Sequence, residues 1–257
     1  MDRRIGAQFY TIREYTQTIG EFEAACKKVK DMGYKIVQIS GQPMAAEEIR
    51  PILDDYDLKV VTTHRNFTDF LERLDWVMDY NQTLGCELCG VGAMPKEYRN
   101  SSDRISQFID EANGVAEKLR AEGLYFGYHN HAFEFAKLDD GKRTMDRLLN
   151  ETDPENVYFI ADTYWLQFGG VNPADFIRKM GKRAMAVHFK DMIIDPDKEF
   201  KPEMAEIGEG NLDWEDIIRA CDEAGTKWAL VEQDRYKENG FKSLKMSYDY
   251  LCTKGFC

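Results

Sequence analysis

The sequence lacks long apolar runs and any excess of positive charge. No apolar segment approaches the ~18 residues that a membrane-spanning helix requires, and the N-terminus contains no apolar core of a secretion signal. The formal net charge of −12 opposes binding to nucleic acid or to an anionic membrane, because both require a basic surface. We therefore expect a cytoplasmic protein whose partners are small molecules rather than nucleic acids or membranes.

Paired cysteines and histidines are also scarce. Of the six cysteines, only Cys86 and Cys89 have CxxC spacing, and no second such pair accompanies them. Because this pair lies in a strand-like stretch, we expect it in the core, with all cysteines as reduced thiols. Each of the four histidines lies at or just past the end of a strand-like segment: His64, His129, His131 and His188.

The chain does contain a regular alternation of strand-like and helix-like segments. The strand-like segments lie near residues 5–9, 36–40, 58–63, 86–91, 124–129, 157–161, 184–188 and 228–232. Glycines such as Gly33, Gly123 and Gly225 follow amphipathic segments, because the residue after a helix often adopts a left-handed backbone. With 257 residues and no linker-like tract, this pattern predicts an α/β fold, a single (β/α)8 TIM barrel over residues 1–257. A doubly wound open sheet is the alternative.

Several strand-like segments are followed by side chains that bind divalent metals. The candidate ligands are Glu134, Asp162, His188 and Glu232. A barrel places its active site at the C-terminal ends of its strands, so these side chains would become neighbours. Carboxylates with an imidazole predict one divalent metal ion: Mn²⁺, Mg²⁺, Co²⁺ or Zn²⁺. For Asp162 the alternative role is that of a helix N-cap.

The segment from Tyr128 to Glu134 is the densest polar cluster. His129 and His131 share one face of the strand, and Glu134 lies beyond its end, where a loop could turn it inward. Any of these three side chains could contact the metal. Glu134 is our choice because a carboxylate-rich set suits Mn²⁺ or Mg²⁺ better than a histidine-rich set.

Other polar side chains at strand ends are candidates for catalysis and substrate binding. Lys190 shares a face with His188, and either pairs with a substrate oxygen or forms a salt bridge with a neighbouring aspartate. Asp234 shares a face with Glu232 and is a candidate base or partner of that ligand. The predicted catalytic residues are Glu134, Glu232, His131 and Lys190, and the predicted substrate-binding residues are His64, His129, Trp165 and Asp234.

Residues 192–212 are the longest stretch without a clear pattern. The run Gly208-Glu-Gly-Asn211 within them is glycine-rich but lacks the spacing of a phosphate-binding loop. We expect an irregular segment here, with residues 208–211 forming a lid or a turn that contacts substrate.

Seven motifs together resemble the sugar isomerase/epimerase superfamily, the xylose isomerase-like TIM barrels. In chain order they are 5–13, 33–41, Tyr128-His-Asn-His-Ala-Phe-Glu134, Asp162-Thr-Tyr-Trp165, His188-Phe-Lys-Asp191, 208–214 and Val231-Glu-Gln-Asp234. The resemblance extends over the full length of the chain. It implies one catalytic metal held by Glu, Asp, His and Glu, and a sugar or keto-sugar substrate converted through an enediolate.

The resemblance also separates branches of this superfamily. Ketose 3-epimerases carry the first glutamate inside the fifth strand and a histidine where this chain has Trp165. In these respects the chain looks more like the branch of inosose dehydratases and enzymes acting on 3-keto-glycosides. We therefore expect a sugar isomerase or epimerase, with a metal-dependent lyase as the alternative. Assembly into a homo-oligomer is left open.

Two other functions are compatible with the fold. The first is an endonuclease IV-like DNA repair enzyme, a family that uses three zinc ions and many histidines. Four histidines and a charge of −12 argue against it. The second is a non-catalytic sugar-binding barrel with a vestigial site.

Overall fold

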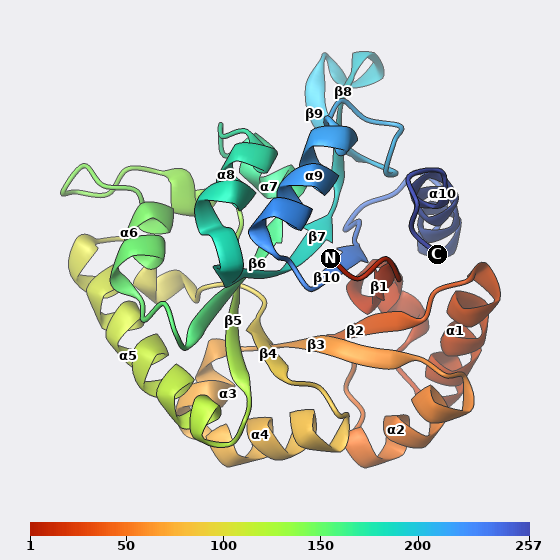
Figure 1. Cartoon of the computed structure of the whole chain (residues 1–257), viewed down its shortest axis with the longest axis horizontal. Helices are drawn as coiled ribbons and strands as arrows, with labels where there is room; N and C mark the ends of the chain where they lie inside the picture. The colour runs from red at the N-terminus through yellow and green to blue at the C-terminus, as the bar shows by residue number, and fades with distance from the viewer.

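A closed barrel of eight parallel strands forms the centre of the protein. The computed structural model describes residues 1–257 (Figure 1). The barrel strands are β1 (Gly6–Gln8), β2 (Ile36–Ser40), β3 (Lys59–Arg65), β4 (Leu88–Val91), β5 (Tyr125–His129), β6 (Val157–Asp162), β7 (Ala184–Phe189) and β10 (Trp228–Val231). Their order around the barrel is β1-β10-β7-β6-β5-β4-β3-β2, and every neighbouring pair is parallel. The predicted barrel is confirmed, and the open sheet is excluded.

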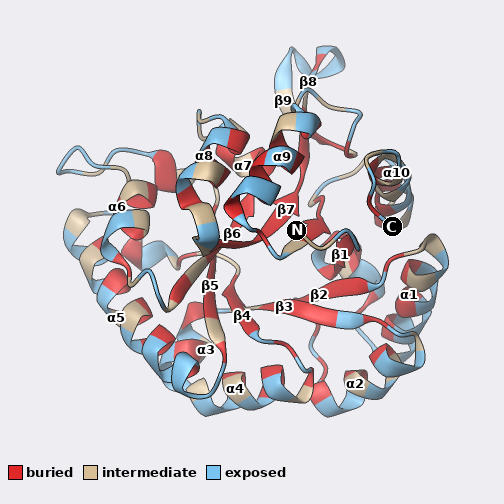
Figure 2. Cartoon of the chain, in the orientation of Figure 1, coloured by how far each residue is buried: buried red, intermediate tan, exposed pale blue.

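Helices surround the barrel and bury one face each against it (Figure 2). They are α1 (Ile19–Met32), α2 (Ala46–Asp55), α3 (Phe67–Glu72), α4 (Leu74–Thr83), α5 (Ser102–Ala121), α6 (Thr144–Glu151), α7 (Thr163–Phe168), α8 (Pro173–Met180), α9 (Trp214–Ala224) and α10 (Gly240–Thr253). Sequence signals define the ends of α1. Thr18 and Glu21 form a capping box at its start, and Gly33 ends it with φ at 110°.

A small apolar cluster fills the inside of the barrel. It comprises Ile36, Val61, Leu88, Ile160, Met185, Ala186 and Leu230. Side chains alternate along a strand, so the residues two positions beyond Ile36, Ile160, Ala186 and Leu230 also point inward, one layer nearer the C-terminal ends. These residues are polar (Gln38, Asp162, His188 and Glu232), and they begin the candidate site.

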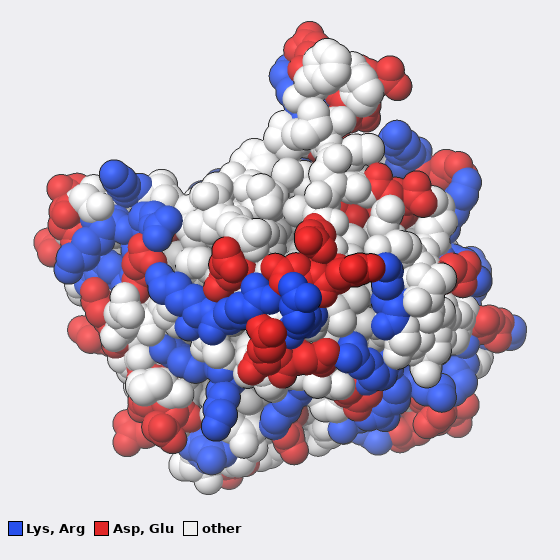
Figure 3. Space-filling model, turned by 45° about the horizontal axis from the view of Figure 1, so that its top comes forward, with Lys and Arg blue, Asp and Glu red and all other residues white.

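Residues 192–212, predicted to be irregular, contain a hairpin. Strand β8 (Asp191–Asp195) pairs antiparallel with β9 (Lys201–Ala205), and the hairpin projects from the top of the molecule in Figures 1 and 3. Asp191 fixes the loop that follows the hairpin: its carboxylate accepts hydrogen bonds from the amides of Gly208 and Gly210 and from the indole of Trp214. The prediction of a lid or substrate-contacting turn at residues 208–211 is not matched, because these residues do not line the cavity of the barrel mouth.

The cysteines differ from the expectation at one position. Cys86 and Cys89 are free and buried, which confirms them as core residues. Cys252 and Cys257, however, form a disulfide, so the expectation of reduced thiols throughout was wrong for this pair.

Two features of the helices and of the surface charge bear on what the protein could bind. None of the helices combines the length and apolar character needed to cross a bilayer. On the face shown in Figure 3, acidic and basic side chains are interleaved rather than gathered by sign.

Candidate active site

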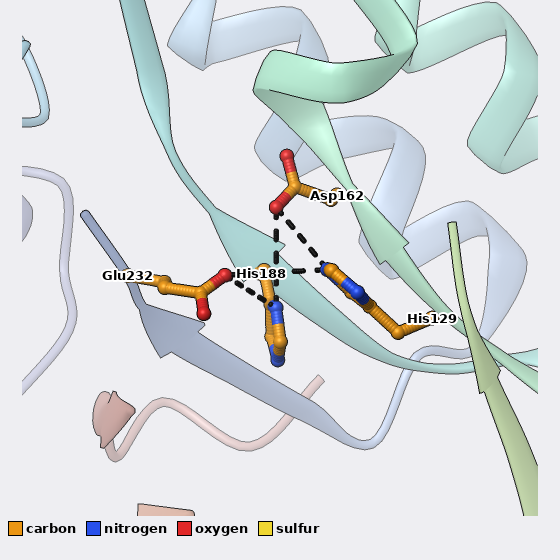
Figure 4. A group of neighbouring side chains, drawn as sticks. All are labelled: His129, Asp162, His188 and Glu232. Carbon is orange, nitrogen blue, oxygen red and sulfur yellow. Dashed lines mark hydrogen bonds and ion pairs between the residues drawn. The ribbon is translucent and has the colours of Figure 1, made fainter. Parts of the chain in front are cut away.

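Four buried side chains converge at the C-terminal end of the barrel. They are His129 at the end of β5, Asp162 at the end of β6, His188 in β7 and Glu232 directly after β10 (Figure 4). One nitrogen or oxygen of each lies within 4.8 Å of those of the other three. The shortest separations are 2.9 Å between His188 Nδ1 and Glu232 Oε2, and 3.3 Å between His129 Nε2 and Asp162 Oδ2.

The barrel register explains this convergence. Asp162 lies two residues beyond Ile160, and Glu232 lies two residues beyond Leu230; both Ile160 and Leu230 belong to the apolar cluster inside the barrel. His188 follows Ala186 in the same way and is the register partner of Asp162 in the neighbouring strand. The alternation of each strand therefore places one polar side chain directly above the apolar interior.

Hydrogen bonds fix the orientation of both imidazoles. His188 Nε2 lies 2.8 Å from Gln38 Oε1, and His129 Nδ1 lies 2.9 Å from the Gly92 carbonyl oxygen. Both oxygens can only accept, so these ring nitrogens carry the protons. His188 Nδ1 then presents a lone pair to the centre of the cluster, which is the arrangement typical of metal-binding histidines. His129 Nε2 also points to the centre, where it hydrogen-bonds Asp162 Oδ2 at 3.3 Å. Burial lowers the pKa of His129, but this bond and the nearby carboxylates raise it overall, so a metal ion would have to displace the Nε2 proton.

Asp162 fulfils both of the roles considered for it. Its Oδ1 accepts a hydrogen bond of 2.9 Å from the Trp165 amide and so caps helix α7, while its Oδ2 points into the cluster. The N-cap and the candidate ligand are two oxygens of one carboxylate.

Lys190 supplies the positive charge of this cluster in the structure. Its side chain is 1% exposed, and its Nζ lies 2.9 Å from Asp162 Oδ2, 2.8 Å from Glu232 Oε2 and 3.0 Å from Asp234 Oδ2. Burial opposes its charge, but the three carboxylates hold the pKa of Lys190 well above its ordinary value. Burial likewise raises the pKa of Asp162 and Glu232, but Lys190 and the neighbouring histidines together outweigh it, so both carboxyls have lowered pKa values.

Despite these charges, the cluster contains a buried polar atom without a hydrogen-bond partner, His188 Nδ1. It faces Glu232 Oε2 at 2.9 Å, an oxygen that has Lys190 Nζ at 2.8 Å as its cation. A ring-nitrogen lone pair repels a carboxylate oxygen, and burial without a partner is costly. A cation that contacted both atoms would satisfy His188 Nδ1, so the residues present fit a divalent metal ion.

Glu134, expected as the first metal ligand, lies outside this cluster. The chain turns after β5 into a short 3-10 helix (Phe133–Phe135), which carries Glu134 behind His131. There its carboxylate accepts hydrogen bonds from the Tyr128 hydroxyl at 2.7 Å and from the His131 amide at 2.9 Å. The structure brings His129 to the position expected for Glu134. Inward alternation from Gly127 was the sequence signal that favoured His129.

Full burial raises the pKa of the Glu134 carboxyl to about 7, although its hydrogen bonds lower it. Its folded pKa thus exceeds its unfolded value, so the folded state binds the proton more tightly. Protonation of Glu134 therefore stabilises the folded protein. This contribution to the free energy of unfolding is complete below the unfolded pKa near 4 and is lost as the pH rises through 7.

We therefore expect Glu134→Gln to remove part of the pH dependence of stability. Between about pH 4 and 8, the free energy of unfolding of the parent protein should fall by up to about 3 kcal/mol more than that of the variant. Urea unfolding of both proteins in the presence of a chelator measures this. Parallel pH profiles for the two proteins would contradict the assignment.

A cavity of about 520 Å³ opens above the cluster. Its lining includes the predicted residues His64, His129, His131, Trp165, Lys190, Glu232 and Asp234, and it also includes Arg65, which the sequence did not single out. Burial lowers the pKa of His131 to about 3 and that of His64 well below its ordinary value, so both imidazoles are neutral near pH 7. Apart from Glu134, the structure therefore gathers the predicted site residues at one place.

A family comparison agrees with this architecture. Residues 26–252 match the model of the family described as xylose isomerase-like TIM barrel. The chain belongs to this family.

Three individual relatives are between 24% and 28% identical to this chain over the aligned residues. The chain is 28% identical to an inosose dehydratase from Clostridium beijerinckii over 173 residues, 62% of this chain and 57% of that protein. It is 24% identical to an inosose dehydratase from Lacticaseibacillus casei over 271 residues, 90% of this chain and 88% of that protein. A solved structure of a sugar phosphate isomerase/epimerase from Parabacteroides distasonis is 25% identical, with a TM-score of 0.80 and coverage of 96% of this chain and 97% of that one. Like these relatives, the chain is an enzyme.

Proposed function

We propose that this enzyme is a divalent-metal-dependent isomerase or epimerase of a sugar or keto-sugar. The observation that carries the proposal is the convergence of His129, Asp162, His188 and Glu232, with one ring nitrogen of each histidine directed inward. Two imidazoles and two carboxylates favour Mn²⁺, Co²⁺ or Zn²⁺ over Mg²⁺, which prefers oxygen ligands. A divalent ion at this place would polarise a substrate carbonyl and acidify the neighbouring C–H bond.

The chain's own residues supply the proton transfers in this proposal. Asp234 lines the cavity, and burial raises its pKa although Lys190 opposes the shift, which makes its carboxylate a stronger base. His131 lines the cavity from the β5 side and Asp234 from the β10 side, with β7 and β6 between them. Asp234 can therefore take a proton from a bound substrate and return it to the neighbouring carbon, as isomerisation requires. Epimerisation also needs a group on the opposite side of the substrate, where His131 lies as a neutral imidazole.

The ammonium of Lys190 provides a positive charge that stays in place while the substrate proton is transferred. Its raised pKa keeps it protonated, and it lines the cavity beside Glu232 and Asp234. We assign it the stabilisation of negative charge on a substrate oxygen. His64 and Trp165 line the same cavity and are assigned to substrate binding, His64 as a neutral imidazole and Trp165 as an aromatic wall.

A metal-dependent dehydratase is the second candidate. The inosose dehydratase relatives support it, as does the absence of a second glutamate from the metal cluster. The same removal of a proton would then be followed by loss of a β-hydroxyl group rather than by return of the proton.

Proton exchange in D₂O tests the shared step and separates the two reactions. The Mn²⁺-loaded protein is incubated with ketohexoses, ketopentoses and a keto-inositol, and NMR follows the hydrogen next to the carbonyl. We expect metal-dependent exchange with at least one of them. An isomer or epimer indicates the first function, whereas a dehydrated product indicates the second. No exchange with any of them by protein that holds stoichiometric metal would contradict both.

A further inference from the structure

Arg65 is the charged residue of the cavity that the proposed chemistry does not use. It ends strand β3, next to His64, and lines the cavity together with Asn66 and Asp69. It forms no hydrogen bond and no ion pair; its Nε and Nη2 atoms are buried without partners, whereas Nη1 is unbonded and not buried. Every other charged residue of the lining has an ion-pair partner: Asp69 has Arg73, and Lys190 pairs with Glu232 and Asp234.

Two aromatic rings hold the Arg65 guanidinium in place. Its Cζ lies 3.8 Å from the centre of the Tyr80 ring and 5.1 Å from that of Trp76. Such stacking stabilises the cation and restricts its plane. Nε and Nη2 are buried, so Nη1 is the donor that remains accessible to an oxyanion. The stacked guanidinium need not be reorganised when the anion arrives.

The charge balance of the cavity also leaves Arg65 unmatched. Lys190 offsets one of the three carboxylates around it, and a divalent ion would offset the other two. Arg73 neutralises Asp69, the acidic residue of the lining nearest to Arg65 in sequence. With the metal in place, the cavity would therefore retain one uncompensated positive charge, that of Arg65.

We propose that Arg65 binds an anionic substituent of the substrate, a carboxylate or a phosphate monoester, at a distance from the reacting carbonyl. The rest of the substrate follows the proposed keto-sugar chemistry, on which this inference rests. The substrate class is thus a keto-sugar acid or a keto-sugar phosphate rather than a neutral sugar. Arg65 acts in binding and selectivity and takes no part in the proton transfers.

Three matched probes test this assignment: fructose, fructuronate and fructose 6-phosphate. They share one ketose skeleton and differ in the neutral, carboxylate or phosphate group at C6. Calorimetric titration of the metal-loaded protein should show at least one anionic probe binding about 10- to 100-fold more tightly than fructose, the range of a charge-assisted hydrogen bond. Preference for fructuronate would identify a carboxylate and preference for fructose 6-phosphate a phosphate.

The variant Arg65→Gln should reduce this ratio of affinities to about one, and Arg65→Lys should keep part of it. Arg120→Gln is the matched control, since Arg120 also stacks on a tyrosine, 4.8 Å from the Tyr125 ring, but does not line the cavity. It should leave the ratio unchanged. A purely structural role of Arg65 would alter the thermal stability of Arg65→Gln without changing the ratio.

Two outcomes would overturn the inference: no preference for either anionic probe, or a preference that survives in Arg65→Gln. In the second case the ion or another group rather than Arg65 would bind the anion. Titration measures binding without turnover, so it is independent of the proton-exchange test. Exchange without anion preference contradicts this inference alone, whereas anion preference without exchange contradicts the proposed function alone.

Discussion

Replacing Glu232 by Gln is expected to abolish metal-dependent activity. The change removes one of the two proposed carboxylate ligands and leaves His188 Nδ1 facing an amide instead of an anion. Replacing a residue that hydrogen-bonds a metal ligand commonly lowers metal affinity by about 10- to 100-fold. Loss of a ligand itself should therefore lower it by more than about 100-fold. Loss of the Lewis acid removes several kcal/mol of stabilisation, so proton exchange should fall by about 1,000-fold or more. Calorimetric titration with Mn²⁺ and exchange in D₂O measure the two effects.

Glu134→Gln is the matched control for this experiment. It makes the same chemical change in another buried glutamate of the same barrel mouth, one that is bound to Tyr128 and the His131 amide. We expect its Mn²⁺ affinity to stay within about threefold of the parent protein, because this carboxylate is not a ligand in our account. If Glu134→Gln lost the metal and Glu232→Gln retained it, the assignment of the ligands would be wrong.

The second large effect is expected for Lys190→Met. Without the ammonium, Asp162, Glu232 and Asp234 face one another with no cation in the metal-free protein. Removing one partner of a buried ion pair typically costs 3–5 kcal/mol, which for a chain of this size lowers Tm by about 10 °C. Saturating Mn²⁺ should stabilise this variant more than the parent protein, since the ion would replace the missing positive charge. Thermal unfolding with chelator and with Mn²⁺ measures both differences.

Lys179→Met provides the control for the loss of a lysine ion pair. Lys179 pairs with Asp146 at 2.9 Å, but its side chain is 47% exposed. Exposed pairs contribute about 0–1 kcal/mol, so its Tm should change little. Equal effects of the two replacements would show that Lys190 does not balance a buried cluster of carboxylates.

The barrel strands could be predicted because their signals are local. Apolar runs such as 157–161 and 184–188 come after segments with helical periodicity, and glycines such as Gly33 mark the turns between helix and strand. The hairpin of β8 and β9 carried no such signal. Its strands include Asp191, Pro202 and Glu203, and it packs outside the barrel, so no apolar alternation identifies it.

The candidate site was predicted less evenly. Asp162 ends its strand, His188 is the last residue but one of its strand and Glu232 directly follows its strand, so alternation alone places them inward. The path of the chain after His129 depends on a 3-10 turn that the sequence does not specify, and this turn decides between His129 and Glu134. Arg65 was not predicted, because the sequence does not show that its guanidinium lacks an ion-pair partner. Only the structure shows this, together with its stacking on Tyr80 and Trp76.

A crystal structure of the Mn²⁺-loaded protein with anomalous diffraction data tests the central claim most directly. We expect one strong anomalous peak, about 2.0–2.3 Å from His129 Nε2, Asp162 Oδ2, His188 Nδ1 and Glu232 Oε2. A peak bound by Glu134 or His131 instead, or no peak at this position in protein that contains stoichiometric Mn²⁺, would contradict the account.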